Sequence, residues 1–533
     1  MLDFIIEWQA IGQDRCHLLE FLAARPHIQR PLTACGHPVT IRTDPSYRVN
    51  RALRQTESNA STDRPGDKGE VLDAFNLVVL GGGTGGYTAA IRAAQLGLSV
   101  AIVEQDKVGG VCLHKGCIPT KVLLEAAEAL SLVRRSDRLG IKAENVRLDF
   151  SSVARRQQEV VEGLHKNLRI LIRKHGVEVI AGRGRLLSPT EIALDTGERK
   201  LSARHVVVAT GSRPKELPGL SCEGQRILTS DHAVGLTALP ESVIIIGGGY
   251  VGLEFASAYL DFGCQVALVE MMPTLLPAED SDLGAGIGRL LGQRGANILT
   301  SARVLTNDLR AYDDVVEVTV ERGGEKSVVR GHKVLVAVGR QGNVEDLGLE
   351  NTRVKAERGF IQVDERMRTA EPNVYAVGDV AGGLLLAHVA AAEGTLAAEA
   401  IAGRNPEPID YSRMPRVVYT RPQVAAVGLT EAEAKGQGLP VKVGRFPFRY
   451  NAMAVIKDEP DGFVKVVISA QSGGLLGVHI LGSGAAEVIG QGTLARWLDA
   501  SAWEVAASVR PHPSLSEALG EALQISLRGS RVQ

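Results

Sequence analysis

A glycine-rich turn of one pattern occurs twice in this chain, each time between a short apolar stretch and a segment with helical periodicity. The apolar stretches, 75–80 and 242–246, are expected to be strands. In both copies a second apolar strand follows the helix and ends at an acid, 23 positions after the first glycine (81 to 104, and 247 to 270). The two sets are Gly81, Gly83, Gly86 and Glu104, and Gly247, Gly249, Gly252 and Glu270. Two βαβ units of matched length predict two doubly wound dinucleotide-binding domains.

Each residue type in this pattern has a physical reason. The first glycine permits a tight turn, the second lets the main chain approach a pyrophosphate, and the third lets the helix pack on the strand. The helix N-terminus then faces the phosphate charge, and the acid accepts hydrogen bonds from a ribose hydroxyl. After Glu270 the chain continues Met271, Met272, Pro273, with no arginine before Arg289. A 2′-phosphate would meet a carboxylate and no cation there, so the second site is predicted to take NAD rather than NADP.

Length and charge exclude several other classes of protein. At 533 residues the chain suggests three or four domains, since domains average about 150 residues. Sixty basic and sixty-one acidic residues give a net charge of −1, so no basic field is available for nucleic acid or an anionic membrane. No apolar run reaches the roughly 18 residues of a membrane span. From about Arg413 onward, short strands alternate with helices without a further glycine-rich loop, which predicts a C-terminal α+β domain.

Two of the six cysteines, Cys112 and Cys117, lie close together after the first acid. In a regular helix, residues five apart have Cα atoms roughly 8–9 Å apart, beyond the limit of about 7 Å for a disulfide. A bond between them therefore requires the helical turn to open, which Gly116 permits, and Pro119 can then lie in the first turn of a new helix. A disulfide closed in this way is a candidate for the labile, catalytic kind. Two buried, reduced thiols that happen to be near each other remain the alternative.

The motifs from about Phe75 to the C-terminus together resemble those of the pyridine nucleotide-disulfide oxidoreductases, and within that family those of the dihydrolipoyl dehydrogenases. No single motif carries the resemblance, and the order of the motifs contributes to it. Besides the two loops, they are GGVCLHKGCIPTK at 109–121, ATG at 209–211, GGGYVGLE at 247–254, AVGR at 337–340, AVGD at 376–379 with Ala387-His388, and HPSLSE at 512–517.

The resemblance implies FAD along the first loop and NAD at the second. Glu104 would hold the adenosine ribose of FAD, and Lys121, paired with Glu254, would lie near the isoalloxazine. The 210–211 segment would contact the adenine half, and Asp379 the ribityl or pyrophosphate region. The implied cofactor-binding set is Gly81, Gly83, Gly86, Glu104, Lys121, Thr210, Gly211, Asp379, Ala387, Gly247, Gly249, Gly252, Glu254, Glu270 and Gly339, and no metal site is expected.

The resemblance also assigns catalytic roles. Cys112 would be the interchange thiol that meets the substrate, and Cys117, nearer the flavin, the charge-transfer thiol. His512 would be the general base that deprotonates a dithiol substrate, with Glu517 orienting it. Because this histidine reaches the disulfide of the other subunit in the family, a homodimer would be needed for activity. The implied reaction is oxidation of protein-bound dihydrolipoyl groups on an acyltransferase or carrier protein, with electrons passing through the disulfide and FAD to NAD⁺.

These implications give the expected domain boundaries. Residues 1–73, polar and charged in their second half, would be an N-terminal extension or linker with neither a signal nor a transit peptide pattern. The α/β remainder would divide into an FAD-binding domain (74–218 and 343–412), an NAD-binding domain (219–342) and a dimerisation domain (413–533). A cytoplasmic location is expected, because no export signal is seen and an exchangeable disulfide needs reducing partners.

The sequence also bears on other functions that a chain with these motifs could have. Glutathione reductase-like enzymes generally need a cationic NADP pocket, which is missing after Glu270. Mercuric reductases and large thioredoxin reductases carry a further C-terminal thiol pair, and no cysteine follows Cys264. An NAD(P)H-dependent reductase of another small disulfide therefore remains an alternative, as does a mainly structural subunit of a 2-oxo acid dehydrogenase complex.

Overall fold

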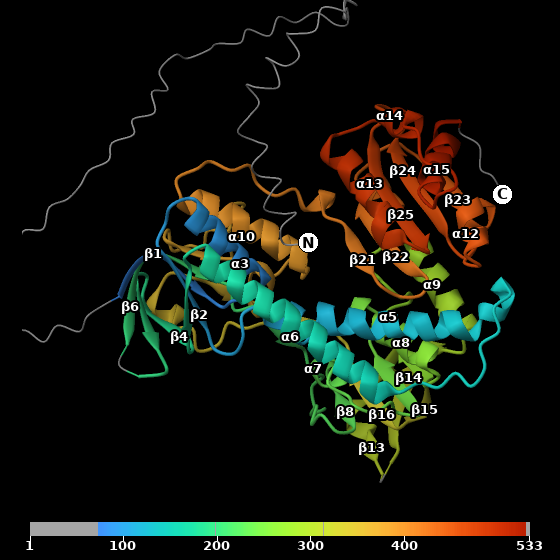
Figure 1. Ribbon diagram of the computed structural model, residues 1–533, viewed down its shortest axis with the longest axis horizontal. Coiled ribbons are helices and arrows are strands. Elements are labelled where there is room, and N and C mark those ends of the chain that lie inside the picture. The colour runs from blue at the N-terminus through green and yellow to red at the C-terminus, as the bar shows by residue number, and fades with distance from the viewer. Residues whose placement is uncertain (1–72, 198, 313, 529–533) are drawn as a thin grey trace, which may run out of the picture. The chain divides into compact units, whose positions relative to one another are not determined.

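The first glycine-rich loop leaves the middle of a mixed sheet (Figure 1). The computed structural model describes residues 73–197, 199–312 and 314–528, so apart from residue 73 the predicted N-terminal extension lies outside the described residues. The strand order is β3-β2-β1-β6-β5-β4, with β20 also paired to β6. Strands β1, β2, β3, β6 and β20 pair in parallel, and β4 and β5 extend one edge antiparallel. The strands are β1 (Asp73–Leu80), β2 (Val100–Glu104), β3 (Glu178–Ala181), β4 (Gly184–Ser188), β5 (Glu191–Leu194), β6 (Lys200–Val208) and β20 (Val374–Ala376).

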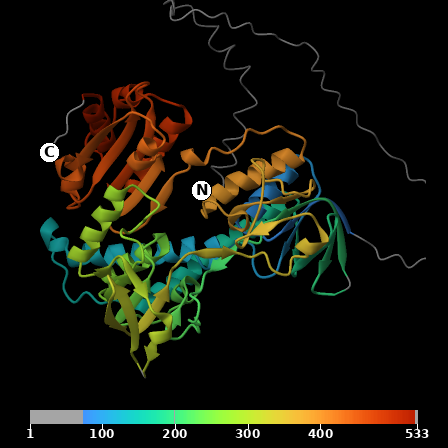
Figure 2. The same cartoon turned by 180° about the vertical axis from the view of Figure 1, so that it is seen from behind.

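Helices from distant parts of the sequence cover this sheet. Helix α3 (Thr84–Gln95) follows the first loop, and α10 (Ala387–Ile401), about 300 residues later, packs against it, as both views show (Figures 1 and 2). Leu77, Val78 and Val79 of β1 are fully buried. A strand buried on both faces reads as a continuous apolar run, which is why this strand could be recognised in the sequence.

The second sheet is parallel throughout, in the order β11-β10-β9-β16-β8. Its strands are β8 (Ile227–Leu228), β9 (Ser242–Ile246), β10 (Gln265–Val269), β11 (Asn297–Leu299) and β16 (Lys333–Val336), with helices α7 (Ser230–Ala233), α8 (Tyr250–Phe262) and α9 (Ser281–Gln293). An antiparallel group lies within the same stretch of sequence: β12 (Ala302–Val304), β13 (Arg310–Ala311), β14 (Val316–Arg322) and β15 (Glu325–Gly331).

Three helices lie in the connection between β2 and β3 of the first sheet. They are α4 (Gly110–His114), α5 (Cys117–Arg134) and α6 (Phe150–Lys174), and α5 packs against both α6 and α8. Two further antiparallel pairs form separate two-stranded sheets. They are β7 (Ser212–Pro214) with β17 (Arg340–Gly342), and β18 (Ala356–Glu357) with β19 (Phe360–Ile361). The 3₁₀ turns are η2 (Ser136–Leu139), η3 (Thr306–Asp308), η4 (Leu349–Asn351), η5 (Gly378–Ala381), η6 (Tyr411–Arg413) and η7 (Phe448–Tyr450).

The C-terminal part is an antiparallel sheet in the order β21-β22-β25-β24-β23 with helices packed on it. The strands are β21 (Arg416–Val418), β22 (Gln423–Gly428), β23 (Val441–Pro447), β24 (Phe463–Ser469) and β25 (Leu475–Gly482). The helices are α11 (Glu431–Gly436), α12 (Ala452–Ile456), α13 (Ala485–Trp497), α14 (Ala502–Ala507) and α15 (Glu517–Arg528). The predicted fold class, two doubly wound units and an α+β unit, is confirmed. Among the described helices, none is long and apolar enough to cross a bilayer.

Element boundaries differ from the sequence prediction mainly at helix starts. The helical periodicity that follows the two loops in the sequence predicts helix starts at Tyr87 and Leu253, but α3 begins at Thr84 and α8 at Tyr250. In α3 the glycines Gly85 and Gly86 lie inside the first turn. Glycine disfavours helix by about 1 kcal/mol, but close packing on the strand outweighs that local preference.

Candidate functional site

The two glycine-rich loops have nearly the same local geometry. Gly81 and Gly247 have φ of 104° and 112°, in the region that favours glycine. A Cβ on Gly81 would lie 2.4 Å from the oxygen of Ala209, and one on Gly247 would lie 2.3 Å from that of Ala337. At the third glycine, a Cβ would lie 2.0 Å from the first glycine's own oxygen in both loops (Gly86 on Gly81, Gly252 on Gly247). Each glycine is therefore required by main chain that cannot move aside.

The middle glycines face open space. A Cβ on Gly249 would meet nothing within 4 Å, and one on Gly83 would first meet the Cα of Gly110 at 4.0 Å. Each loop is followed directly by a helix whose N-cap is a glycine, Gly83 or Gly249, and a glycine has no side chain that could cap the helix. The first main-chain N–H groups of α3 and α8 are thus available to phosphate oxygens.

Both strand-end acids accept main-chain hydrogen bonds from their own loops. Glu104 accepts from the N–H of Gly82 at 2.7 Å and of Asp106 at 2.8 Å. Glu270 accepts in the same way from Gly248 at 2.6 Å and Met272 at 2.7 Å. These bonds fix each carboxylate beside its loop and still leave lone pairs for ribose hydroxyls, because an ionised carboxylate has about four acceptor positions.

A cavity of about 660 Å³ runs from the first loop to the cysteine pair. It brings together eleven of the predicted site residues: Gly81, Gly83, Glu104, Cys112, Cys117, Lys121, Thr210, Gly211, Glu254, Asp379 and Ala387. The remaining ones, Gly86, Gly247, Gly249, Gly252, Glu270, Gly339, His512 and Glu517, do not line it. A phosphate cradle at one end and two thiols at the other fit an extended dinucleotide with a redox-active ring, so these residues fit FAD.

The two cysteines lie on either side of a break between helices. Cys112 belongs to α4, the chain leaves the helix at Lys115 and Gly116, and Cys117 is the first residue of α5. Pro119 lies in the first turn of α5, as predicted. Both cysteines are thiols in this structure, and they are hydrogen-bonded to each other. The break removes the separation that a continuous helix would impose.

The two thiols are not equivalent. The hydrogen bond from the Cys112 thiol lowers the pKa of Cys117, and the charge of Lys121 lowers it further against the effect of burial. The same hydrogen bond, with burial, raises the pKa of Cys112. In the reduced pair, the negative charge therefore belongs on Cys117, with Cys112 as the protonated donor.

Lys121, one turn after Cys117, is held by an acid from the second sheet's helix. Its Nζ lies 2.9 Å from both Oε1 and Oε2 of Glu254, whose side chain is 8% exposed. Burial acts to lower the pKa of Lys121, but Glu254 more than offsets this and the pKa is raised. The Nζ also lies 4.6 Å from the ring centre of Tyr419. Lys121 is thus a fixed cation beside the sulfur of Cys117.

Around the middle of the cavity, hydrogen bonds join segments that are far apart in the sequence. The Oγ1 of Thr210 donates to the oxygen of Asn343 at 2.8 Å, and the Asn343 side chain returns a bond to the Thr210 oxygen at 2.9 Å. Asp379 accepts from the hydroxyl of Ser212, which in turn accepts from Arg340 Nε at 2.6 Å. Gly211, with φ of 69°, has open space around it, which leaves room for a ligand.

Two residues of this region were missed by the sequence analysis, Glu393 and Tyr419. Glu393 of α10 accepts from the N–H of Gly378 at 2.7 Å and from the hydroxyl of Tyr411 at 2.9 Å, and burial raises its pKa to about 7. It thereby holds the turn that carries Asp379. Neither residue belongs to a local motif, so only the packing of separate segments reveals them.

His512 and Glu517 are paired near the start of α15. His512 Nδ1 lies 2.9 Å from Glu517 Oε1, and Glu517 Oε2 accepts from the N–H of Ser514 at 2.8 Å. The bond from Ser514, followed by that from His512, lowers the pKa of Glu517. Because an ionised carboxylate can only accept, Nδ1 carries the proton and Nε2 is left as the base. The His512 side chain is 75% exposed.

Comparisons with known proteins agree with this geometry. The family model described as "Pyridine nucleotide-disulphide oxidoreductase" matches residues 75–394, and the dimerisation domain of the same family matches residues 414–523. The chain belongs to the pyridine nucleotide-disulphide oxidoreductase family. It is a flavin-dependent disulfide oxidoreductase, and its cofactors are FAD and NAD.

Curated relatives match over most of their length. The chain is 44% identical over 459 residues to the dihydrolipoyl dehydrogenase of Bacillus subtilis, a match that covers 84% of this chain and 97% of the relative. It is 42% identical over 458 residues to the dihydrolipoyl dehydrogenase of Zymomonas mobilis, covering 85% of this chain and 98% of the relative.

Among solved structures, LpdA of Mycobacterium tuberculosis superposes with a TM-score of 0.79 at 29% identity, covering 85% of this chain and 99% of that one. The HOCl-induced flavoprotein disulfide reductase RclA of Escherichia coli, as its Cu(II) complex, superposes with a TM-score of 0.76 at 26% identity, over 85% of this chain and all of RclA.

Replacing Gly86 by alanine is expected to abolish flavin loading. The added methyl group would overlap the oxygen of Gly81, so the helix start must shift away from the strand that carries the phosphate cradle. The flavin absorbance of the purified protein, per mole of polypeptide, measures the effect. Gly163→Ala, at a helical position of α6 where a Cβ would meet nothing within 4 Å, is the control for a glycine replacement alone. Full flavin content in Gly86→Ala would contradict the assignment of this loop.

Proposed function

We propose that this protein oxidises protein-bound dihydrolipoyl groups to lipoyl groups and transfers the electrons to NAD⁺. The observation that carries the proposal is the polarised thiol pair, Cys112 and Cys117, beside Lys121 at the end of the cavity that begins at the first loop. The curated relatives named above, dihydrolipoyl dehydrogenases that match along almost their whole length, support this substrate. FAD, when bound, takes two electrons from a thiol pair and passes them on as hydride.

Thiol exchange is the part of the reaction that the chain's own residues perform. A substrate thiol gives its proton to His512 Nε2, and the resulting thiolate attacks Sγ of Cys112 in the oxidised pair. The Cys112–Cys117 bond breaks and Cys117 leaves as a thiolate beside Lys121. The second substrate thiol then displaces Cys112 and closes the lipoyl disulfide. Two electrons pass from the substrate to the cysteine pair and one S–S bond replaces another. Of the two substrate protons, one remains on His512 and the other protonates Cys112 as it leaves.

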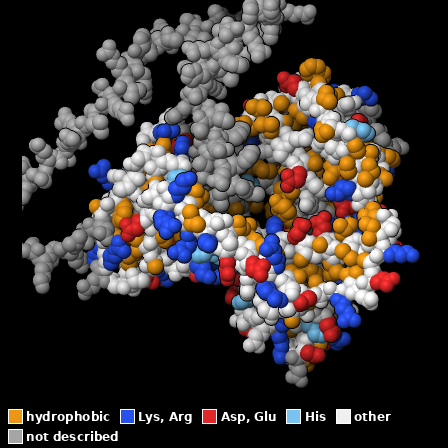
Figure 3. All heavy atoms as spheres, in the orientation of Figure 1, with side chains coloured by type: hydrophobic (Ala, Val, Ile, Leu, Met, Phe, Trp, Pro, Cys, Tyr) orange, Lys and Arg blue, Asp and Glu red, His pale blue; other side chains and the backbone are white. Residues whose placement is uncertain are grey.

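His512 is proposed to serve the thiol pair of a second copy of the chain. It does not line the cavity that contains Cys112, and its side chain is largely exposed. Hydrophobic side chains gather on the C-terminal part, at the upper right of Figure 3. Exposed large hydrophobic residues there include Tyr450, Val455, Ile456, Leu494, Trp497, Leu498, Trp503 and Val509. A homodimer formed through this part would cover apolar surface and bring His512 to its substrate.

The substrate-bearing partner is proposed to be a lipoylated acyltransferase or carrier protein. The cytoplasm is the compartment that fits an exchangeable disulfide, because reducing partners are available there.

Formation of NADH from dihydrolipoamide by the flavin-loaded protein tests the proposed function. We expect kcat/KM for NAD⁺ to exceed that for NADP⁺ by about 100-fold or more, because a buried carboxylate at Glu270 opposes a 2′-phosphate. If dihydrolipoamide is not oxidised but NADH reduces another small disulfide, the substrate assignment is wrong and the disulfide reductase alternative is supported. No turnover with any dithiol or disulfide would favour a structural role.

A further inference from the structure

One face of α8 carries three polar side chains that contact a single short stretch of the chain. Glu254, Ser257 and Asp261 are three and four positions apart, which places them on one side of the helix. All three are buried. The stretch that runs along this side is 419–421, directly after β21 of the C-terminal sheet. Two parts of the molecule far apart in sequence are therefore joined along one line of contacts.

Three contacts fasten the stretch to the helix. The N–H of Tyr419 donates to Glu254 Oε1 at 3.0 Å, and the N–H of Arg421 donates to Ser257 Oγ at 2.9 Å. The side chain of Arg421 then reaches Asp261, with Nε 3.0 Å from Oδ2. The last of these is an ion pair on a carboxylate whose side chain is only 6% exposed.

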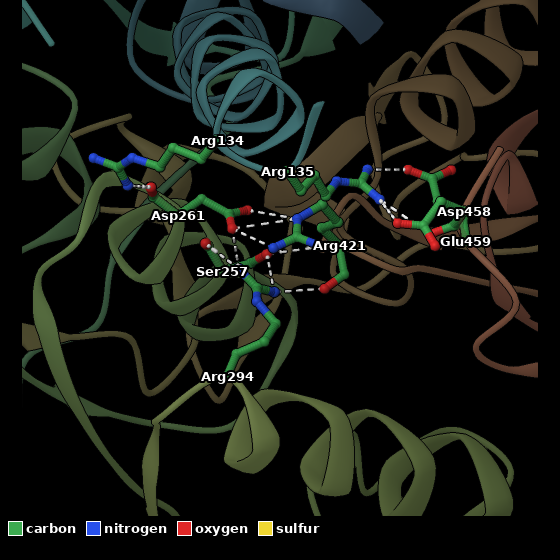
Figure 4. Close-up of polar contacts among 8 residues, drawn as sticks. All are labelled: Arg134, Arg135, Ser257, Asp261, Arg294, Arg421, Asp458 and Glu459. Carbon is green, nitrogen blue, oxygen red and sulfur yellow. Dashed lines mark hydrogen bonds and ion pairs between the residues drawn. The ribbon is translucent and has the colours of Figure 1, made fainter. Parts of the chain in front are cut away.

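A second arginine strengthens the same contact. Arg294, at the end of α9, places Nη2 2.9 Å from Asp261 Oδ1 and donates from Nη1 to Ser257 Oγ at 3.1 Å and to the main-chain oxygen of Arg421. Figure 4 shows both guanidinium groups converging on Asp261. Because a buried charge left without its partner is strongly unfavourable, this cluster resists separation of 419–421 from α8.

At its other end, this line of contacts reaches Lys121, the cation beside Cys117. Glu254, which accepts from Tyr419, is also the acid that holds Lys121 through both of its oxygens. The ring of Tyr419 lies against the same Nζ. Displacing 419–421 would therefore take from Lys121 a cation–π contact and from Glu254 a hydrogen bond, while leaving every residue in the cavity chemically intact.

We propose that Arg421, held by Asp261 and Arg294, is a positioning residue that keeps the Lys121–Glu254 pair in place beside Cys117 through the main chain of Tyr419. The proposal rests on the proposed role of Cys117 as the thiolate, but not on the identity of the substrate. Arg421 does not line the cavity that contains Cys117, so it acts only through the segment it anchors.

In Arg421→Gln, two changes are expected to shift the pKa of Cys117 in the same direction. A less fixed Lys121 stabilises the Cys117 thiolate less, and a Glu254 carboxylate that has lost a donor opposes that thiolate more. Both raise the pKa of Cys117. The titratable and charged groups around Cys117, from each element packed against it, are Cys112 of α4, Lys121 of α5, Glu254 of α8, Tyr87 of α3 and Tyr419. Arg421→Gln changes none of these residues.

The pH dependence of Cys117 alkylation, resolved by peptide mass spectrometry, tests the proposal. It is measured on the flavin-loaded protein in a Cys112→Ser background, where Cys117 cannot form the disulfide. We expect Arg421→Gln to reduce the thiolate fraction of Cys117 at pH 7 by about twofold to fivefold relative to the parent, which corresponds to a rise of about half to one pKa unit from a value of about 7. The long-wavelength thiolate–flavin band, titrated in the same samples, is expected to shift to higher pH by the same amount.

Arg135→Gln is the matched control. Arg135 Nη2 lies 2.6 Å from Glu459 Oε1, and its side chain is about as buried as that of Arg294, but it contacts 458–459 rather than 419–421 (Figure 4). It should lower the unfolding temperature and leave the Cys117 titration unchanged. Arg421→Lys, which restores the charge without the planar fork, should give an intermediate shift.

An unchanged Cys117 titration in Arg421→Gln, with an unfolding temperature lowered as in Arg135→Gln, would overturn the proposal and leave Arg421 a purely structural residue. If Arg421→Gln does not fold, Ser257→Ala removes the acceptor of the Arg421 N–H with a smaller disturbance, and an unchanged titration there has the same consequence. Neither measurement uses a lipoyl substrate, so failure of the proposed function and failure of this inference are distinguishable.

Discussion

Replacing Cys117 by serine is expected to reduce NADH formation from dihydrolipoamide by a factor on the order of 10⁴ or more, with flavin still bound. A hydroxyl cannot form the disulfide that accepts the substrate's electrons. Titration of the purified protein with a dithiol gives the decisive spectrum. The wild-type protein should develop a long-wavelength thiolate–flavin band, and Cys117→Ser should not.

Cys112→Ser separates the two thiols. It should be as inactive as Cys117→Ser, yet it should retain the thiolate–flavin band, because the charge belongs on Cys117. Cys222→Ser, which changes a thiol whose pKa is raised by burial and which does not line the cavity, should leave turnover within about twofold of wild type. A band that survives in Cys117→Ser and disappears in Cys112→Ser would reverse the assignment of the two sulfurs.

The sequence alone predicted those site residues whose roles are set within a single strand–turn–helix unit. Gly86 meets the main-chain oxygen of Gly81 within the turn itself, and Glu104 accepts from the loop it follows. Such constraints depend on local spacing, so they can be recognised as a pattern, and they recur in the second copy with nearly the same distances. The break between Cys112 and Cys117 was predicted for the same reason, from helix geometry and Gly116.

The sequence alone did not predict contacts between site residues that lie on two segments far apart in the chain. Lys121 and Glu254 are paired across the interface of α5 and α8, and this pairing was expected only from the family resemblance. Nothing around Tyr419 or Glu393 marks them, because their partners come from α8 and from the turn at Gly378. Helix starts were also misplaced, since the packing that permits glycine in the first turn of α3 is a tertiary effect.

Replacing His512 by glutamine is expected to lower kcat/KM for dihydrolipoamide by about 10²- to 10⁴-fold, the usual contribution of a general base. Nε2 would no longer accept the substrate's proton at neutral pH. The loss should shrink as pH rises toward the pKa of the substrate thiols, because they then ionise without a base. His388→Gln is the control for a histidine outside the proposed chemistry, and its side chain faces the oxygen of Pro415. An unchanged pH profile in His512→Gln would exclude it as the base.

Mixed dimers test whether His512 serves the partner's thiol pair. A dimer of one Cys112→Ser subunit and one His512→Gln subunit contains one complete site only if His512 acts across the interface, and it should then show about half of wild-type activity although each parent is inactive. The reverse arrangement, a wild-type subunit with a subunit carrying both substitutions, should be inactive, because each site then lacks one group. If the first mixed dimer is inactive and the second is active, His512 acts within its own chain.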